Sequence, residues 1–346
     1  MNDSVSARPH KRPTLEDVGA RAGVSRALVS IVMRGVPGAS AETRERVLQV
    51  AAEMGYRPDA RARLLASNSS PLLGVVFSQF GVFHLELLDG LYSTAEQLGC
   101  DVILSALTTH RDERRAVETL QDFRCDAVIL LGPEGGTPVL AGRLPVTVVG
   151  WRVKDPAVDV VRSSDSQGAR QAVDHLVDLG HTEIIHVDGG RGSVSVARRS
   201  SYRAAMRRNG LEPQVRASGG GFTQEDGVRA AQLLLQEPSL PTAIVAFNDD
   251  IAAGVLETFR AAGLQVPQAI SIVGWNDSSL SRLPHLDLTT VRQDPNEMAR
   301  LAVERSVERV TGAPVTDREV VLPTELIVRS STGPPSKAAE DVLSQR

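Results

Sequence analysis

Cysteine and long apolar runs are both scarce in this chain. Only Cys100 and Cys125 occur in 346 residues, which excludes a disulfide framework and a four-cysteine zinc site. The longest apolar runs, such as PLLGVVF at 71–77, are far shorter than the roughly 18 residues that a membrane-spanning helix needs. The first residues, MNDSVSARPHKRP, lack the apolar segment of a secretory signal. We therefore expect a cytoplasmic location and two free thiols.

The motifs of several enzyme classes are also absent. The sequence has no G-x-x-x-x-G-K-[ST] phosphate loop, no G-x-S-x-G elbow and no H-E-x-x-H metal motif. GGRGSV at 189–194 lacks the full G-x-G-x-x-G spacing and a suitable acidic partner, so we interpret it as a turn. His175, His181 and His186 do not share a helix face, and we interpret them as capping and core residues. The sequence favours binding over catalysis, with no cofactor and no metal site.

Charge is divided unevenly along a chain of otherwise ordinary composition. A content of 42% hydrophobic and 23% charged residues is typical of a globular protein, and the length predicts two or three domains. Residues 1–70 hold 11 Lys and Arg against 7 Asp and Glu, a balance of +4, whereas the rest holds 27 against 35, a balance of −8. A basic N-terminal segment on an acidic body suggests contact with a polyanion.

From Leu72 onward, apolar runs alternate with amphipathic helical patterns. Near-continuous apolar runs are typical of parallel strands that are covered on both faces. In SQGARQAVDHLVDLGH, at 166–181, the apolar residues form one stripe, and Gly180 is a suitable end for a helix. Strands alternating with helices predict an α/β fold with right-handed crossovers. The expected strands are 72–78, 101–107, 126–132, 146–151, 183–189, 242–248 and 270–276.

Two sheets fit this pattern better than one. About nine strands and seven helices exceed a compact doubly wound unit, and VVRSSDSQG at 160–168 offers a polar break midway. A helical pattern resumes within 286–312, which would let the chain cross back into the first lobe. Two lobes imply a cleft between them, and small ligands bind in such clefts.

The stretch TLEDVGARAGVSRALVSIVMRG, at 14–35, predicts two short helices that meet at a sharp turn. Thr14 can cap a helix that begins at Leu15, Gly23 can adopt the turn conformation, and Ser25 can cap the second helix. A third amphipathic helix at 40–56 would complete a small core. This is the helix-turn-helix pattern, whose second helix enters the DNA major groove. The alternative is a plain three-helix cap on the α/β body. The residues expected in the core are Leu15, Val18, Ala22, Val24, Leu28, Val29, Val32, Val47, Val50, Ala51 and Met54.

These motifs, together with DSQGARQAVDHLVDLGHTEIIHVDGG, AFNDDIAAGVLETFRAAGLQVP, ISIVGWND and LTTVRQD, resemble those of lactose-repressor/galactose-repressor family transcription factors. The likeness runs to about residue 330. It implies a dimeric DNA-binding repressor with a two-lobed, periplasmic-binding-protein-like (type I) sensor domain. It also implies a ligand in the cleft, commonly a sugar, and no enzymatic activity.

The resemblance implies a set of DNA contacts in the first two helices. Arg26 could pair with guanine, whereas Ala27 and Leu28 could make only apolar contacts with bases. Ser25 and Ser30 match phosphate contacts. Ile31 and Arg34 depart from the family's usual residues, so we expect an operator that differs from the usual half-site. Gly19 replaces a common Ala. The predicted DNA-contacting residues of this segment are Thr14, Ser25, Arg26, Ala27, Leu28, Ser30 and Arg34.

RPDARARLLAS, at 57–67, resembles the family's hinge, which forms a short helix in the minor groove of the operator. Leu65 aligns with the apolar wedge between base steps, Ala62 with the site of close helix approach, and Arg61 with a phosphate contact. The alternative is an ordinary flexible linker.

In the sensor domain, the resemblance implies five ligand-facing residues, which are Phe83, His84, Arg198, Asn248 and Asn276. Asn276 stands where sugar-binding members commonly have Asp, and a neutral amide both donates and accepts hydrogen bonds. Trp151 and Trp275 could stack on a ligand ring, or could serve packing. The predicted effector-binding residues are Phe83, His84, Trp151, Arg198, Asn248, Trp275 and Asn276.

The predicted organisation is a DNA-binding domain at 1–57, a hinge at 58–70, an effector-binding and dimerisation domain at 71–330, and a flexible tail at 331–346. The N-terminal lobe would comprise about 71–163 and 291–322, and the C-terminal lobe about 164–290 and 323–330. The tail has no leucine heptad, so we expect a homodimer on a palindromic operator. Two alternatives remain, a solute-binding protein of transport and an α/β enzyme with a DNA-binding appendage.

Overall fold

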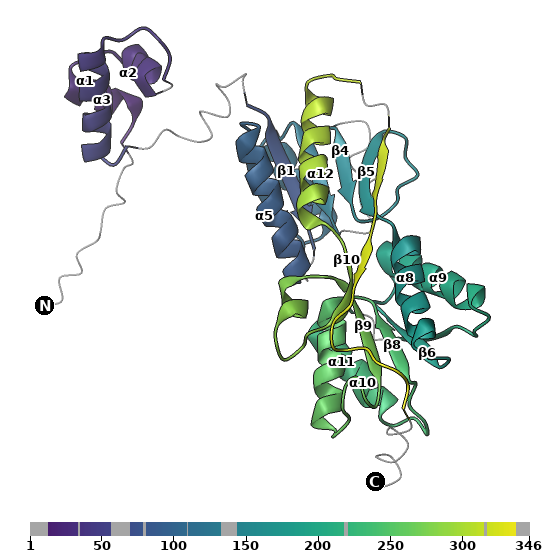
Figure 1. Cartoon of the computed structure of the whole chain (residues 1–346). Helices are drawn as coiled ribbons and strands as arrows, with labels where there is room; N and C mark the ends of the chain where they lie inside the picture. Colours follow the sequence, from purple (N-terminus) through teal and green to yellow (C-terminus); the bar gives the residue numbers. More distant parts are fainter. Residues whose placement is uncertain are drawn as a thin grey trace, which may run out of the picture. The chain divides into compact units, whose positions relative to one another are not determined.

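A computed structural model describes residues 13–33, 35–56, 70–78, 81–108, 110–132, 144–217, 221–314 and 317–336. The chain forms two compact units, Met1–Ser70 and Pro71–Arg346 (Figure 1). Within the described residues, no helix combines the length and the apolar character needed to cross a membrane.

The N-terminal unit contains the three predicted helices, α1 (Leu15–Ala22), α2 (Arg26–Met33) and α3 (Ala41–Glu53). Thr14 and Asp17 form a reciprocal capping box at the start of α1. Gly23 ends α1 in the left-handed conformation with φ of 69°, and the Ser25 hydroxyl accepts a hydrogen bond from the Leu28 N–H at 3.2 Å. The expected helix-turn-helix arrangement is therefore present.

The core of this unit forms where the three helices meet. The buried apolar side chains are Val18, Ala22, Val29, Val32, Val47 and Ala51. Leu28, expected to face α1, is only partly buried and is not part of this cluster. A Cβ on Gly19 would lie 2.8 Å from the Val24 carbonyl oxygen, so glycine allows α1 to approach the turn closely.

The first lobe of the C-terminal unit contains a six-stranded sheet in the order β11-β5-β4-β3-β1-β2. All of its strand pairs are parallel. Helices α5 (Val82–Gln97) and α12 (Pro295–Val310) pack side by side on it, with α6 (Glu113–Asp122) beside β1 and β2 (Figure 1). The strands are β1 (Leu72–Phe77), β2 (Asp101–Ala106), β3 (Ala127–Leu131), β4 (Val146–Val149), β5 (Val158–Ser163) and β11 (Glu319–Leu322).

The second lobe repeats this plan with strand order β12-β10-β9-β8-β6-β7. Only β12 runs antiparallel to its neighbour. The strands are β6 (Ile184–Asp188), β7 (Gln214–Ala217), β8 (Ala243–Ala246), β9 (Ser271–Asn276), β10 (Thr289–Arg292) and β12 (Glu325–Ile327). The helices are α8 (Asp165–Asp178), α9 (Ser193–Arg208), α10 (Gln224–Leu234) and α11 (Asp249–Ala261), with a 3-10 turn, η1 (Ser279–Arg282).

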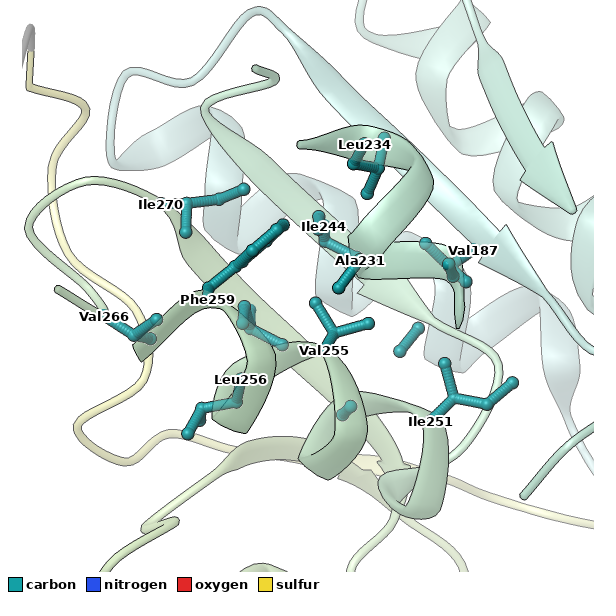
Figure 2. Close-up of a cluster of buried hydrophobic side chains, with 14 of the residues drawn as sticks. Val187, Ala231, Leu234, Ile244, Ile251, Val255, Leu256, Phe259, Val266 and Ile270 are labelled. Atoms are coloured by element: carbon teal, nitrogen blue, oxygen red, sulfur yellow. The ribbon is translucent and has the colours of Figure 1, made fainter. Parts of the chain in front are cut away.

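Helices α10 and α11 pack unusually closely over the core of the second lobe. Figure 2 shows Ile251, Val255 and Phe259 of α11 among the buried side chains of this core. A Cβ on Gly254 would lie 2.1 Å from the Gln224 carbonyl oxygen, a distance that no real side chain tolerates. Glycine at this position therefore sets the spacing of the two helices.

The chain crosses between the lobes after β5, after β10 and after β11, as the sheet orders require. The expected break at 160–168 is wrong in its first half. Residues 160–163 belong to β5, where Val160 and Val161 are buried beside β4, and the crossing follows at Ser164.

The segment 331–346 was expected to be a flexible tail, but its first residues are hydrogen-bonded to the second lobe. The Ser331 hydroxyl donates to the Ile272 carbonyl at 2.6 Å and accepts a hydrogen bond from the Thr289 N–H at 2.8 Å. His181 donates through Nε2 to the Gly333 carbonyl at 2.8 Å. Ser331 and Gly333 therefore belong to the second lobe, because they bond to residues at the amino-terminal ends of β9 and β10.

Candidate functional site

Helix α2 presents a polar and partly basic surface opposite its buried face. Ser25, Arg26 and Ala27 are exposed, while Leu28 and Ser30 are partly buried. Arg26 lies 3.7 Å from Glu16, and both side chains are largely exposed. An exposed ion pair of this kind is worth about 0 to 1 kcal/mol, so it leaves Arg26 available for another partner.

The remaining predicted DNA contacts divide into two groups. Thr14 is exposed, and its hydroxyl is already paired with Asp17 in the capping box of α1. Arg34, Arg61, Ala62 and Leu65 lie outside the described residues.

A cleft of about 460 Å³ lies between the two lobes of the C-terminal unit. It is lined at the carboxyl ends of parallel strands from both sheets, where ligands of open α/β folds bind. Six of the seven predicted effector-binding residues line it: Phe83, His84, Trp151, Arg198, Asn248 and Asn276.

Arg198 is the central charged group on the wall of the cleft that the second lobe forms, the C-terminal wall. Its guanidinium is 4.7 Å from the ring centres of both Phe247 and Trp275, and its side chain is almost fully buried. It donates to the Phe247 carbonyl at 2.5 Å and to Asp165 at 3.4 Å. Burial lowers the pKa of Arg198 and the Asp165 carboxylate opposes this shift, so the guanidinium keeps its charge.

Trp275 does not line the cleft, although its neighbour Asn276 does. It is 1% exposed and lies against the guanidinium of Arg198. Its indole N–H is buried and has no partner among the described residues. Trp275 therefore supports Arg198 from within the lobe, and the cleft surface is formed by other side chains.

Two amides have fixed orientations at the same wall. Asn248 caps α11 through its oxygen, which accepts from the Ile251 N–H at 2.8 Å, and its nitrogen donates to the Phe222 carbonyl at 2.7 Å. The oxygen of Asn276 accepts from Gln293 Nε2 at 2.8 Å. Asn276 has φ of 124°, a conformation that non-glycine residues rarely adopt, so the fold holds its amide in place at some cost.

Apart from Glu113, the opposite wall of the cleft is mainly apolar. His84 packs edge to face on Phe83, with ring centres 5.9 Å apart. Burial, together with the charge of Arg198, lowers the pKa of His84 to about 4. The imidazole is therefore neutral at pH 7 and offers one donor and one acceptor.

The sequence analysis did not identify several cleft residues. Gln293 lines the cleft and orients Asn276, although it is 17 residues away in the sequence. Gly189, Gly192 and Ser195 also line it, so the GGRGSV turn is part of the cleft wall. The available signal was their position directly after β6, since loops at this end of a parallel sheet face the ligand.

Three histidines of the second lobe, His175, His181 and His186, have structural partners. His175 is hydrogen-bonded to Thr332 at 3.0 Å, and His181 to Thr242 at 2.9 Å. His186 donates through Nδ1 to the Val245 carbonyl at 2.8 Å. Within the part of the chain that the structure describes, no group of three or more His, Cys, Asp or Glu residues could hold a metal ion.

Comparison with known proteins identifies both units. Residues 14–59 match the bacterial regulatory proteins of the lacI family, and residues 173–332 match the periplasmic binding protein-like domain. The chain is 31% identical to the lactose operon repressor of Escherichia coli K12 over 334 residues, covering 94% of this chain and 92% of that protein. The chain belongs to the lacI family. It is thus related to transcriptional repressors, and the family resemblance stated from the motifs is confirmed.

Other members of the lacI family agree over similar lengths. The ribose operon repressor of Escherichia coli K12 is 30% identical over 329 residues, which cover 92% of this chain and 99% of that protein. A crystal structure of a LacI transcriptional regulator from a Rhodococcus species is 41% identical, has a TM-score of 0.72, and covers 76% of this chain and 99% of its own. The lac repressor dimer bound to operator and the anti-inducer ONPF is 28% identical, with a TM-score of 0.80 over 93% of this chain and 100% of its own.

Proposed function

We propose that this lacI-family regulator is a repressor that binds a palindromic operator as a homodimer and whose operator affinity is controlled by a small ligand. The ligand is a sugar or a related metabolite, and it binds in the cleft between the lobes. The observation that carries the proposal is the combination, in one chain, of a helix-turn-helix unit and a cleft lined by six of the seven predicted effector-binding residues.

The DNA-binding role is supported by the surface of α2. Arg26 and Ala27 are exposed at the N-terminal end of α2, from which recognition helices contact base edges. Ser25, Leu28 and Ser30 lie beside them, and Thr14 starts the first helix. In this proposal, Arg34 extends the basic surface, and Arg61, Ala62 and Leu65 belong to a hinge that orders in the minor groove.

Effector binding is supported by the geometry of the cleft. Arg198, Asn248 and Asn276 present oriented polar groups on one wall, and Phe83, His84 and Trp151 supply aromatic surface on the other. Such a combination of apolar lining and a few fixed polar groups is typical of small-molecule sites. Trp275 contributes by holding Arg198 in place.

Dimer formation is supported by an apolar surface on the first lobe. Leu85 and Tyr92 of α5 are exposed, and Leu104 on the neighbouring edge strand β2 is exposed as well. Contiguous exposed apolar side chains and an uncovered strand edge are features of protein interfaces. The lac repressor solved with operator is likewise a dimer.

We further propose that the protein acts by binding and not by catalysis, in the cytoplasm where its DNA lies. The polar side chains of the cleft support this, because the oxygens of Asn248 and Asn276 are already occupied by the Ile251 N–H and by Gln293. A carboxamide positions a ligand by hydrogen bonding, and it neither gains nor loses a proton at neutral pH.

Operator binding and ligand control can be tested together. The full-length protein would select its operator from genomic fragments, and binding would then be measured by fluorescence anisotropy with each member of a sugar and sugar-derivative library. Enrichment of a palindromic sequence and a shift of its affinity by one class of compound are expected. An Arg198→Ala variant should bind the operator normally and respond to no compound. Selection of no sequence, or a response that Arg198→Ala retains, would contradict the proposal.

A further inference from the structure

Helix α9 begins at the cleft with no side chain over its N-terminus. Its N-cap residue is Gly192, which cannot supply a capping group. The first bond of the helix runs from the Val196 N–H to the Gly192 carbonyl at 2.9 Å. Among the described residues, the N–H groups of Ser193, Val194 and Ser195 have no hydrogen-bond acceptor. The positive end of a 16-residue helix is therefore open toward the cleft.

The loop before α9 is held rigidly in this conformation. A Cβ on Gly189 would lie 2.6 Å from the Phe247 ring, so only glycine fits there. Gly190 has φ of 95°, and its N–H donates to Asp188 at 3.1 Å. Arg199 binds both Asp188 and the Gly190 carbonyl. The orientation of the free N–H groups is thus set before a ligand arrives.

A second observation at the same place also indicates a missing partner. Ser195 is 2% exposed and lines the cleft, and its hydroxyl has no hydrogen-bond partner among the described residues. No group in the described part of the chain uses this hydroxyl, so it can donate a hydrogen bond to a ligand oxygen in the cleft.

Positive charge lies on this wall as well. Arg198 lines the cleft beside Ser195, and Arg191 precedes Gly192 in the loop. Arg191 is exposed and has no ion pair within the described segments, so its charge is available to a ligand. Two arginines, a serine hydroxyl and three backbone N–H groups make a donor set for an oxyanion.

The carboxylates near the cleft leave this wall positive. Asp165 is paired with Arg198, and Asp188 is paired with Arg199. Glu113 lines the cleft from α6, which belongs to the other lobe. Another helix that begins at the cleft, α5, is different. A Cβ on its N-cap residue Gly81 would lie 3.2 Å from the Asp250 carboxylate, so a negative group is already close to that terminus.

We infer that the C-terminal wall, defined by Arg191, Gly192, Ser195 and Arg198, binds an oxyanion, so that the effector is a sugar derivative carrying a phosphate or a carboxylate. This inference rests on the proposed function, because it names the chemical class of the ligand of the same cleft. It also gives a role to the GGRGSV segment, whose glycines place the helix terminus at the cleft.

Inorganic phosphate is the simplest probe of this site. Thermal unfolding of the full-length protein would be followed against phosphate concentration, with chloride used to keep the ionic strength constant. Phosphate should raise the Tm of the wild-type protein, since a ligand that binds only the native state stabilises it. In Gly192→Asp, the new carboxylate should cap α9 itself, keep the protein folded and weaken phosphate binding about tenfold or more.

A matched control carries the same charge change elsewhere. Ser40→Asp places a carboxylate at the N-cap of α3, in the other compact unit. This variant should respond to phosphate like the wild type. Absence of a phosphate effect in the wild type, or an equal effect in Gly192→Asp, would overturn the inference.

Charged sugars then distinguish the two kinds of oxyanion. Calorimetry would compare glucose 6-phosphate, glucuronate and glucose on the wild type and on Gly192→Asp. Binding of at least one charged sugar that Gly192→Asp loses supports the site, and binding of glucose as tight as that of both charged sugars contradicts it. Operator selection is independent of these measurements. Normal operator binding without any anion binding would refute this inference alone, and anion binding without an operator would refute the proposed function alone.

Discussion

Glu86 accepts a hydrogen bond from the Ser279 N–H at 2.9 Å and thereby joins the two lobes of the sensor domain. Glu86 belongs to α5 of the first lobe, whereas Ser279 begins the 3-10 turn η1 of the second lobe. Arg282, in the same turn, lies 4.0 Å from Glu86. A single carboxylate therefore holds both lobes beside the cleft, and its loss should favour an open arrangement.

Removal of this link should expose the cleft. In Glu86→Ala, Trp151, which lines the cleft and is nearly buried, should become more accessible. Acrylamide quenching of tryptophan fluorescence should increase, and a Trp275→Phe background would isolate the signal of Trp151, since the chain has two tryptophans. Glu118→Ala, which removes an exposed carboxylate of α6, is the control. Equal quenching in Glu86→Ala and wild type would show that this bond does not control the opening.

Substitution of Arg26 should relax operator choice at one base pair in each half-site. Loss of a bidentate base contact costs about 1 to 3 kcal/mol at the position that it reads and little elsewhere. Anisotropy titrations against all single-base operator variants would measure the effect of Arg26→Ala, with Arg46→Ala on the exposed side of α3 as the control. A uniform loss over every variant would instead assign Arg26 to a phosphate contact.

Substitution of Leu65 tests the predicted hinge, which lies outside the described residues. If paired leucines open the minor groove, Leu65→Ala should lose operator bending and specific affinity together. Nonspecific binding, and its dependence on salt, should hardly change because both rest on phosphate contacts. Affinity for operator and for random DNA would be compared while the bend angle is measured. If Leu65→Ala keeps full operator affinity and full bending, residues 57–67 act only as a linker between the two domains.

The contact between α10 and α11 should be intolerant of any added side-chain atom. In Gly254→Ala, the new Cβ would meet the Gln224 carbonyl oxygen at 2.1 Å, and the helices would have to separate. Overpacking of this kind costs about 1 to 3 kcal/mol, which denaturant unfolding would measure. Gln232→Ala, on the exposed side of α10, should change stability by no more than about 0.5 kcal/mol. Wild-type stability in Gly254→Ala would show that the helices shift freely.

Acid should destabilise the sensor domain partly through His186. Burial lowers its pKa from 6.5 to about 4, so between these values the unfolded chain holds a proton that the native state does not. The free energy of unfolding should therefore fall as the pH drops through this window, by about 1.4 kcal/mol per pH unit for one proton.

His186→Gln should make the free energy of unfolding less dependent on pH in this window, by the contribution of one proton. His84, whose pKa is also lowered to about 4, would keep its own contribution. Burial raises the pKa of Asp249 to about 7, so protonation of this carboxyl increases the free energy of unfolding as the pH falls, in both proteins alike. Only the difference between the slopes of the two proteins therefore reports on His186. Urea unfolding at several pH values would provide it. Identical slopes for His186→Gln and wild type would mean that His186 is protonated in the native state.

The sequence by itself determined seven of the strands, the three N-terminal helices and the alternation of strands with helices, whereas β5, β7, β10, β11 and β12 were not among the expected strands. Thr14, Gly23 and Ser25 act on backbone groups within a few residues of themselves, so the caps and the turn of the helix-turn-helix unit could be predicted locally. The apolar runs of the strands and the stripe on α8 follow from the same short-range periodicity. Most of the ligand-facing positions came from long motifs, whose spacing is fixed by these elements.

Only the tertiary structure decided which side chains of those elements reach the cleft. Adjacent residues of one strand diverge, so Asn276 lines the cleft while Trp275 lies against Arg198 within the lobe. Gln293 became part of the site through β10, and Ser331 became part of the second lobe through bonds to distant strands. The open end of α9 has the same origin. A glycine run predicts a turn, but its direction depends on Phe247, which lies far along the chain and leaves no room for a side chain at Gly189.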